Sequence, residues 1–293
     1  MVEQHYSVIS CYKYINIKNP DDLKNQQISI CNTLNLKGRI IIAKEGINAT
    51  LSGKIKNIET YKKELLKNIY FSDITFKENK ATSHAFQRLS IKIKDEIVSF
   101  SKKVDLSKGG KKISPKQLKT LIENNEGIII LDARNNYEVK IGKFRNALSL
   151  NISDFRDFPK NIHKISHLKN KKIITYCTGG VRCEKASAYL VENGFKEVFQ
   201  LEGGILNYNA QHPNTYFEGK CFVFDNRIST PINLGSNSTI IASCEICNKP
   251  CDNYINCSNI NCDKLFICCP ACTRNLNASC SLSCALAKDK RTK

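Results

Sequence analysis

The chain has 293 residues, with 45 Lys and Arg against 27 Asp and Glu, so its formal net charge is +18. This length predicts two or three domains, and the hydrophobic (41%) and charged (25%) fractions are ordinary for a globular protein. No apolar run is long enough to cross a membrane, and the first residues, MVEQHYSVIS, lack the pattern of a secretory signal. We therefore expect a cytoplasmic protein with no membrane partner. The charge by itself fits either a solvated lysine surface or a polyanionic partner.

The first domain is predicted over residues 1–105, where strand-like and helix-like stretches alternate. YSVISCYKYI, the two halves of GRIIIAKEGINATLSG, DITFKEN and FQRLSIKIKDEIVSF have the pattern of strands. NPDDLKNQQISICNTLN and IKNIETYKKELLKNIY have the pattern of helices. The order β-α-β-β-α-β predicts a ferredoxin-like, split βαβ domain with an α+β architecture.

The second domain is predicted over residues 106–219 and follows a linker. Residues 101–116, SKKVDLSKGGKKISPK, are polar and contain six lysines, which is typical of a linker. At its end, Ser114 suits a helix N-cap, Pro115 the first helical position and Gln117 the third. Beyond it, the runs GIIILDAR, KKIITYC and EVFQLEGG are short and apolar, as buried parallel strands are. The pattern predicts an α/β domain with a parallel sheet.

The stretch YCTGGVRCEKASAYL, residues 176–190, carries the strongest sign of chemistry. Cys177 lies where the strand KKIITY ends and a helix begins, at the sheet edge where α/β proteins bind ligands. Glycines allow the backbone amides of such a loop to turn inward as an anion-binding nest, and the same field favours a thiolate. The motif predicts a nucleophilic Cys177, an amide cradle and a closing Arg182, rather than an inert buried thiol; the cradle residues are Thr178, Gly179, Gly180 and Val181.

A second cysteine, Cys183, directly follows Arg182 and would lie in the first turn of the helix. One interpretation is structural filler. The other is an accessory or resolving thiol that forms a disulfide with Cys177. We include Cys183 among the candidate catalytic residues.

The third domain is predicted over residues 220–293 and is rich in cysteine. Ten of the 15 cysteines lie between Cys244 and Cys284. Two Cys-x2-Cys pairs suit tetrahedral four-thiolate zinc, because a two-residue turn brings two thiolates to one metal ion. An iron–sulfur cluster and a disulfide cluster are the alternatives. We expect two interleaved structural zinc sites with Cys268 as the spare, and the predicted ligands are Cys244, Cys247, Cys251, Cys257, Cys262, Cys269, Cys272, Cys280 and Cys284.

The loop resembles the active-site loop of rhodanese domains, in which four residues separate a persulfide-carrying cysteine from an arginine. LDARNNYEVKIGKFRNALSLNI resembles a second rhodanese segment, although Lys143 replaces the usual His and Asn151 the usual Pro. The four-residue gap favours a sulfur-sized anion over the phosphate bound by related phosphatases. The matching residues of this segment are Asp132, Arg134, Glu138, Gly142 and Ala147.

The chain as a whole resembles the bacterial tRNA wobble-uridine hydroxylase family. The motifs AKEGINATLSG, YCTGGVRCEKASAYL and CEICNKPCDNYINC occur in that family in this order. The resemblance implies oxygen-dependent conversion of the tRNA wobble uridine to 5-hydroxyuridine, with the anticodon loop as partner, O2 as co-substrate and Cys177 as the required cysteine. No organic cofactor is evident. Cys177 would act either as a thiolate that adds to C6 of uridine or as a persulfide or sulfenate that carries the oxidising equivalent.

Two other functions share these motifs. A sulfurtransferase would use Cys177 and Arg182 to pass sulfane sulfur to a small thiol or to tRNA. A non-catalytic, zinc-stabilised RNA-binding adaptor would not need Cys177 at all. The lysines of the first domain either bind tRNA phosphates or, as we favour, form the solvated face of a helix; they are Lys54, Lys56, Lys62 and Lys63. His84, Phe86 and Arg88 are guesses for residues near a substrate base.

Overall fold

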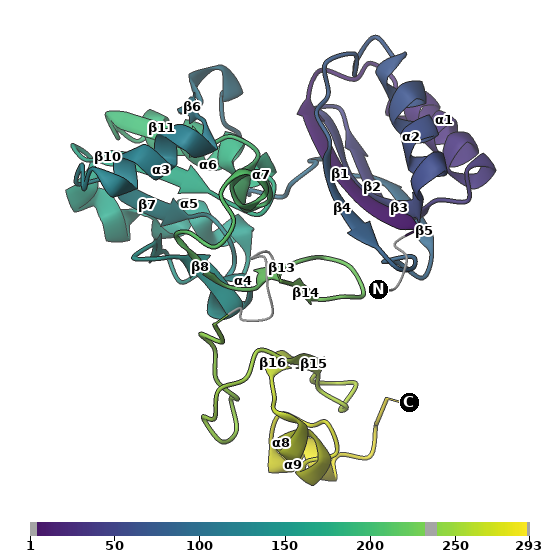
Figure 1. Cartoon of the computed structure of the whole chain (residues 1–293), viewed down its shortest axis with the longest axis vertical. Coiled ribbons are helices and arrows are strands. Elements are labelled where there is room, and N and C mark those ends of the chain that lie inside the picture. Colours follow the sequence, from purple (N-terminus) through teal and green to yellow (C-terminus); the bar gives the residue numbers. More distant parts are fainter. Residues whose placement is uncertain (1–4, 232–238, 292–293) are drawn as a thin grey trace.

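The structure is a computed structural model that describes residues 5–231 and 239–291. Figure 1 shows three bodies, coloured from purple at the N-terminus through teal to yellow at the C-terminus. Each body corresponds to a different kind of predicted architecture: an α+β domain, an α/β domain with a parallel sheet, and a cysteine-rich module. The predicted fold class is therefore confirmed.

The N-terminal domain has one five-stranded sheet and two helices. Its strands are β1 (Tyr6–Tyr14), β2 (Lys37–Ala43), β3 (Gly46–Lys54), β4 (Lys77–Ala81) and β5 (Leu89–Ile93), and its helices are α1 (Pro20–Thr33) and α2 (Ile55–Leu66). The sheet order is β4-β1-β3-β2-β5. All pairs are antiparallel except β2 with β5. The first four strands have the order of a split βαβ sheet, and β5 extends it at one edge.

Successive side chains of β1 point to opposite faces of the sheet, and the two faces have different surroundings. Ile9 and Cys11 belong to the hydrophobic core under α1 and α2. Ser10 and Tyr12 point to the opposite face, because successive side chains of a strand alternate. Both helices lie on one side of the sheet, and the other side faces the second domain (Figure 1).

The second domain is built on the parallel sheet β6-β11-β10-β7-β9. These strands are β6 (Lys111–Ile113), β7 (Ile129–Asp132), β9 (Leu148–Ser149), β10 (Lys172–Tyr176) and β11 (Glu197–Leu201). Its helices are α3 (Pro115–Glu123), α4 (Asn136–Ile141), α5 (Phe158–Asn161), α6 (Val181–Glu192) and α7 (Gly204–Gln211). Short 3-10 turns cover Leu106–Lys108, Phe155–Asp157 and Ile162–Leu168, and a small antiparallel pair joins β8 (Gly142–Phe144) to β12 (Phe217–Gly219).

The end of the predicted linker is part of this sheet. Residues 111–113 form the edge strand β6, which pairs with β11, so the expectation of a linker as far as residue 116 was wrong. Lys111 and Lys112 are exposed and only Ile113 is buried, so the strand lacks the apolar run by which buried strands are recognised. The predicted helix start is confirmed, because Ser114 and Gln117 form a reciprocal capping box at the start of α3.

The C-terminal module packs against α4 of the second domain. It follows the short hairpin β13 (Cys221–Phe222) and β14 (Ser229–Thr230), and it contains β15 (Tyr254–Asn256), β16 (Leu265–Ile267), α8 (Pro270–Asn275) and α9 (Leu282–Leu286). The Tyr254 hydroxyl donates a hydrogen bond of 2.5 Å to the carbonyl of Tyr137. Lys140 and Glu245 form an ion pair of 3.0 Å across the same boundary. Within the described ranges, no helix is both long and apolar enough to cross a membrane.

Candidate active site

Cys177 lies in the loop that joins β10 to α6, as the strand-to-helix pattern predicts. Gly180 caps the helix with a φ of 100°, a left-handed conformation that glycine adopts without strain. This conformation turns the Gly180 amide toward the cysteine, and its N–H donates to Sγ of Cys177 at 3.1 Å. The loop thus places a buried sulfur against backbone donors at the N-terminus of a twelve-residue helix.

The surroundings of Cys177 favour the thiolate. Burial alone would raise the pKa of this thiol, but four interactions outweigh it and lower the pKa to about 5. They are the hydrogen bond from Cys183, the positive charge of Arg182, and the backbone N–H groups of Arg182 and Gly180. At neutral pH the sulfur is therefore ionised, which is the reactive form of a cysteine.

Cys183 is buried in the first turn of α6 and hydrogen-bonds to Cys177. Burial and the neighbouring Cys177 raise the pKa of the Cys183 thiol well above its ordinary value. Cys183 thus stays protonated and acts as a donor to the thiolate. This contact fits the accessory role that the sequence offered as one alternative for Cys183.

Arg182 is held by a buried carboxylate on another helix. Its Nη1 and Nη2 donate to the Oε2 and Oε1 atoms of Glu138, at 2.5 and 2.7 Å. Glu138 is fully buried on α4, where it also receives a long hydrogen bond of 3.4 Å from the Thr178 hydroxyl. The sequence offered Glu138 only as part of a resemblance, and the structure brings it to the loop as the partner of Arg182.

Three other matching residues of that segment, Asp132, Arg134 and Gly142, serve the fold of the second domain. Arg134 is fully buried and donates through Nη2 to the Asp132 carboxylate at 2.6 Å and to the Gly142 carbonyl at 2.7 Å. The Tyr176 hydroxyl donates to the same carboxylate at 2.5 Å. This network joins β7, β8 and the end of β10 directly beneath the loop, so it fixes the position from which Cys177 leaves the sheet.

A second glycine turn supports the loop from behind. The amides of Ile205 and Leu206, at the start of α7, donate to the carbonyls of Cys177 and Thr178 at 3.0 and 3.1 Å. Gly204 has a φ of +64°, and a Cβ on it would lie 2.3 Å from the Cys177 carbonyl oxygen. Only glycine at position 204 lets α7 approach the loop this closely.

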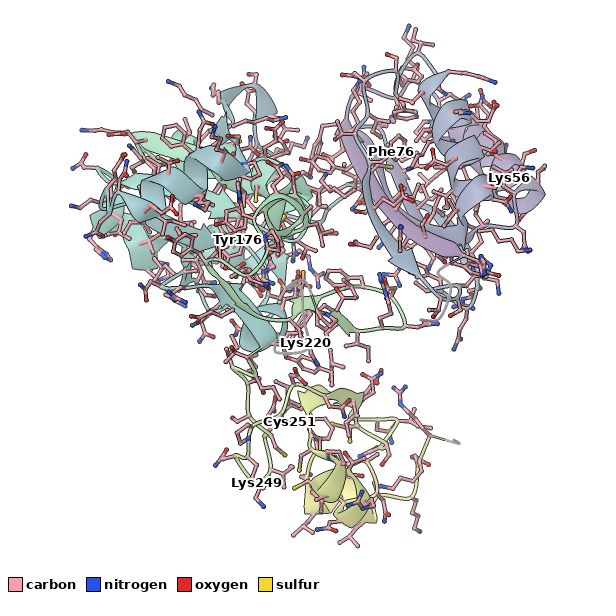
Figure 2. All side chains as sticks on the ribbon, in the orientation of Figure 1. Lys56, Phe76, Tyr176, Lys220, Lys249 and Cys251 are labelled. Carbon is pink, nitrogen blue, oxygen red and sulfur yellow. The ribbon has the colours of Figure 1, made fainter. Side chains whose placement is uncertain are left out.

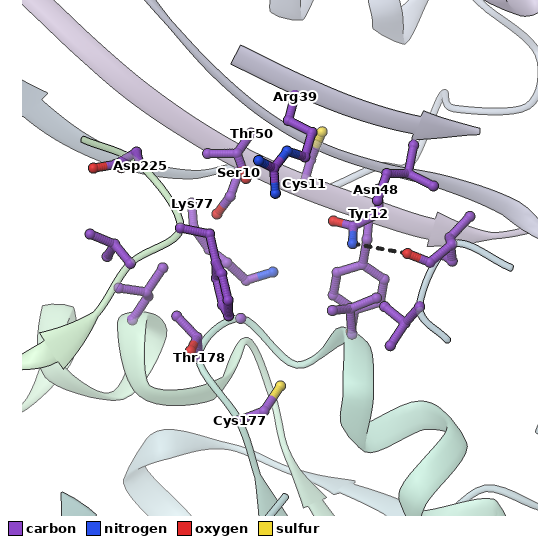
Figure 3. Close-up of a pocket in the computed structure, with 18 of the residues that line it drawn as sticks. Ser10, Cys11, Tyr12, Arg39, Asn48, Thr50, Lys77, Cys177, Thr178 and Asp225 are labelled. Atoms are coloured by element: carbon purple, nitrogen blue, oxygen red, sulfur yellow. Dashed lines mark hydrogen bonds between the residues drawn. The ribbon is translucent and has the colours of Figure 1, made fainter. Parts of the chain in front are cut away.

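Cys177 opens into a pocket of about 310 Å³ between the two domains (Figure 3). The loop residues Cys177, Thr178, Gly179, Val181 and Arg182 line one side of it. The helix-free face of the N-terminal sheet lines the other side, and the segment after β13 closes one end. Phe86 is among the lining residues, whereas His84 hydrogen-bonds to the Ser52 carbonyl and, like Arg88, does not line the pocket.

The N-terminal domain is docked onto α6 by polar contacts that the sequence did not reveal. The Tyr12 hydroxyl donates to Glu184 at 3.1 Å, and the Tyr14 hydroxyl donates to the Val181 carbonyl at 3.2 Å. Lys185 is buried and its Nζ contacts Oε1 of two carboxylates of the N-terminal domain, at 2.8 Å from Glu45 and 2.7 Å from Glu96. The alternation of side chains along β1 could have indicated this contact, because it places Tyr12 and Tyr14 on the face away from the core.

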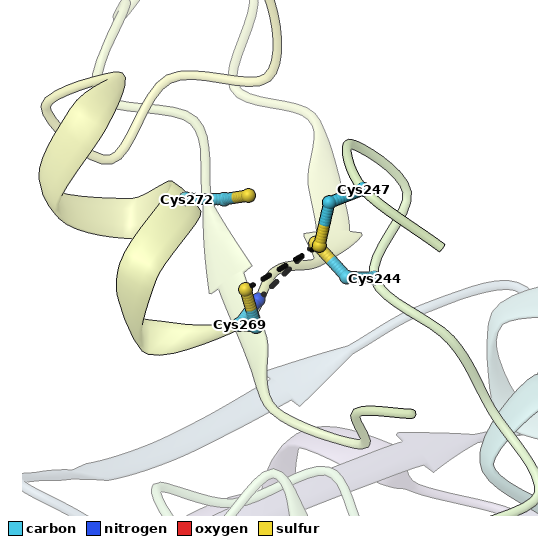
Figure 4. A group of neighbouring side chains, drawn as sticks. All are labelled: Cys244, Cys247, Cys269 and Cys272. Atoms are coloured by element: carbon cyan, nitrogen blue, oxygen red, sulfur yellow. Dashed lines mark hydrogen bonds between the residues drawn. The ribbon is translucent and has the colours of Figure 1, made fainter. Parts of the chain in front are cut away.

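Eight cysteines of the C-terminal module form two groups that could each hold a metal ion. One group is Cys244, Cys247, Cys269 and Cys272 (Figure 4), and the other is Cys257, Cys262, Cys280 and Cys284. Within each group the sulfur atoms lie within 4.8 Å of one another. The two groups alternate along the chain, which is the interleaved arrangement expected from the sequence.

Two cysteines of the module lie outside both groups. Cys268 is fully buried and was expected to be spare. Cys251 was predicted as a ligand, but it is buried elsewhere, and its sulfur accepts a hydrogen bond from the Asn253 amide at 3.4 Å. The reason is stoichiometric: four thiolates complete a tetrahedral site, so two groups of four leave no place for Cys251.

Known proteins resemble this chain over nearly its whole length. A protein of Cytophaga hutchinsonii named tRNA uridine(34) hydroxylase is 40% identical, and the match covers 98% of this chain and 92% of that protein. A protein of the same name from Aster yellows witches'-broom phytoplasma is 42% identical, with 98% and 94% covered. The chain belongs to the tRNA uridine(34) hydroxylase family. The resemblance drawn from the three sequence motifs is thereby confirmed.

Family models match three successive parts of this tRNA uridine(34) hydroxylase family member. Residues 6–97 match the UPF0176 acylphosphatase like domain. Residues 114–211 match the rhodanese-like domain, and residues 218–285 match the rhodanase C-terminal model. The resemblance of the Cys177 loop to a rhodanese loop is therefore confirmed for its whole domain.

Proposed function

We propose that this protein is an enzyme that hydroxylates C5 of the wobble uridine of tRNA, with Cys177 as the reacting group. The observation that carries the proposal is the position of Cys177, which lies at the floor of a pocket between two domains with the Gly180 amide donating to its sulfur. A chain of this family, with a nucleophilic sulfur open to a cavity, has the parts needed for chemistry on a bound base. The reaction takes place where mature tRNA is found, in the cytoplasm.

The size and position of the pocket fit one unstacked base. Its volume of about 310 Å³ is at the lower end of ligand pockets, roughly 300 to 1,000 Å³, so it admits a nucleotide but not a helical stem. C5 of a stacked uridine is out of reach of a buried sulfur, and the base must leave the stack. An anticodon loop meets this requirement at low cost because its bases are already unpaired.

In this proposal Arg182 and Cys183 hold the sulfur as an anion, and the loop from Thr178 to Val181 supplies the amide cradle. O2 supplies the oxygen atom of the product, and an external two-electron donor reduces the other oxygen atom to water. Sulfur transfer would use the same loop, so the loop geometry does not separate the two reactions. Two other observations favour hydroxylation over sulfur transfer. One is the family of the chain, and the other is the pocket, whose second wall belongs to another domain.

The test is mass spectrometry of tRNA nucleosides from cells that lack the gene and carry either the wild-type chain or the Cys177→Ala variant. We expect 5-hydroxyuridine and its derivatives to return with the wild-type chain and to remain absent with the variant. Growth with and without oxygen tests the co-substrate. Full restoration by Cys177→Ala would refute the role of this cysteine, and loss of a thiolated nucleoside instead would identify a sulfurtransferase.

We also propose that the two cysteine groups bind structural zinc. Four thiolates at about 2.3 Å from one zinc ion are about 3.8 Å apart in a tetrahedron. The sulfur–sulfur distances are 3.7 Å for Cys247 with Cys269 and 3.7 Å for Cys262 with Cys280. They are too long for a disulfide, whose sulfurs are about 2.05 Å apart.

Elemental analysis of the purified protein tests this assignment. We expect two zinc ions per chain in the wild type and in the Cys251→Ala and Cys268→Ala variants, because these two cysteines lie outside the groups. Cys272→Ala and Cys284→Ala should each lose one ion. Iron in place of zinc, or an ion lost from Cys251→Ala, would contradict it.

A further inference from the structure

The wall of the pocket that belongs to the N-terminal sheet carries positive charge without matching negative charge. Arg39, Lys77 and Lys94 line this wall, and none of them has an ion-pair partner within the described residues. The two acidic residues that line the pocket already have ion-pair partners. Glu96 pairs with Lys185, and Asp225 pairs with Arg227. The remaining charge of the wall therefore suits an anionic ligand.

Lys77 is the most confined of these cations. It lies on the edge strand β4, and its Nζ is 4.9 Å from the centre of the Tyr12 ring. Burial lowers the pKa of Lys77, and the nearby Cys177 thiolate opposes this effect only in part. Figure 3 shows the side chains of Lys77 and Arg39 directed into the space above Cys177. A partly desolvated ammonium group with no counter-ion is unfavourable, and a bound anion would offset that cost.

Phe224 gives the same pocket an aromatic surface. Its side chain is 49% exposed, and it is the only phenylalanine among the exposed large hydrophobic residues of the described chain. The guanidinium carbon of Arg182 lies 5.8 Å from the centre of its ring, so the ring stands next to the reactive loop. An exposed aromatic ring beside cationic side chains is the combination by which proteins bind unstacked nucleotides.

We propose that this pocket binds one unstacked nucleotide of an RNA strand, with its base against Phe224 and its flanking phosphates on Arg39 and Lys77. The inference rests on the proposed function in taking the ligand to be RNA. It assigns RNA binding to the helix-free sheet face, and not to the lysines of α2. Those lysines are on the far side of the domain, as Figure 2 shows for Lys56, and Lys62 is already paired with two glutamates.

The test measures binding without turnover. An RNA of anticodon stem–loop sequence is titrated into the full-length Cys177→Ala protein at several salt concentrations. Arg39→Gln and Lys77→Gln should each weaken binding about tenfold and reduce the slope of log Kd against log salt by about 0.7, as expected for one lost single-strand phosphate contact. Phe224→Ala should weaken binding about tenfold with an unchanged slope, and Phe224→Tyr should bind like the parent.

Lys56→Gln and Lys63→Gln are the matched controls, since both remove an exposed lysine of α2. We expect them to bind within twofold of the parent. Equal losses in the α2 variants, unchanged binding in the three pocket variants, or no binding by the parent would each overturn the inference. Thermal melting of every variant excludes unfolding as the cause of a loss.

The outcome is separable from the proposed function because binding and turnover are read independently. Binding that depends on Arg39, Lys77 and Phe224, without any 5-hydroxyuridine from the wild-type enzyme, would support the subsite and refute the hydroxylase. Turnover by the wild-type enzyme, together with unaffected binding in the three variants, would support the hydroxylase and refute the subsite.

Discussion

The clearest test of the site is the replacement of Arg182 by glutamine, followed by measurement of the pKa of Cys177. Arg182 is the positive charge beside the thiolate, and its removal leaves Glu138 buried next to the loop. Both changes disfavour an anion at Cys177, so both raise its pKa. The backbone amides and Cys183 remain, and the pKa should stop short of the ordinary value of 9.0.

The size of the expected effect follows from the ionised fraction of Cys177 at two limiting pKa values. With a pKa of about 5, about 99% of Cys177 is ionised at pH 7, whereas with the ordinary value of 9.0 about 1% would be. We expect a pKa above 7 in Arg182→Gln, which corresponds to a loss of at least about 2.7 kcal/mol of thiolate stabilisation. Activity at pH 7 should fall at least twofold on ionisation alone and recover in part as the pH rises toward 9.

The assay is the ultraviolet absorbance of the thiolate against pH, taken as the difference between each protein and the same protein with Cys177→Ser. The difference removes the contribution of the other cysteines. A double variant, Arg182→Gln with Glu138→Gln, controls for the buried carboxylate, and its pKa should lie between those of the wild type and the single variant. If Cys177 in folded Arg182→Gln still titrated near pH 5, the arginine would not be the cause, and the reasoning would fail.

Three further predictions concern the support of the loop. Cys183→Ala removes the thiol donor and should raise the pKa of Cys177 while leaving measurable turnover; complete loss of turnover with an unchanged pKa would instead indicate a resolving thiol. Gly204→Ala places a methyl group 2.3 Å from the Cys177 carbonyl oxygen, so it should abolish activity and lower the melting temperature. Normal activity and stability of this variant would contradict the packing of α7 against the loop. Lys185→Met leaves two carboxylates unpaired at the domain boundary and should lower the free energy of unfolding, measured in urea, by about 3 kcal/mol. The control Lys119→Met breaks a surface ion pair and should lower it by about 0.5 kcal/mol or less. Equal effects of the two variants would show that this ion pair does not hold the boundary.

Local sequence determined the elements whose cause is local. The capping box at Ser114 and the glycine of the Cys177 loop each depend on residues within a few positions of one another. The strand-to-helix position of Cys177 follows from one apolar run and one helical run, and the structure places Cys177 there with the Gly180 amide donating to its sulfur. The edge strand β6 escaped prediction because its pairing with β11 is made by backbone groups, which its lysines do not reveal.

Tertiary structure decided everything that brings distant residues together. Glu138 lies 44 positions from Arg182, and the N-terminal sheet lies more than 80 positions before the loop that it covers. The sequence indicated a reactive cysteine, but the depth of its pKa shift depends on contacts between α4, α6 and the loop. It likewise indicated four-thiolate sites, yet only the folded module separates the eight grouped cysteines from Cys251. Short-range spacing encodes a motif, whereas a pocket is formed by surfaces that meet only when the domains pack.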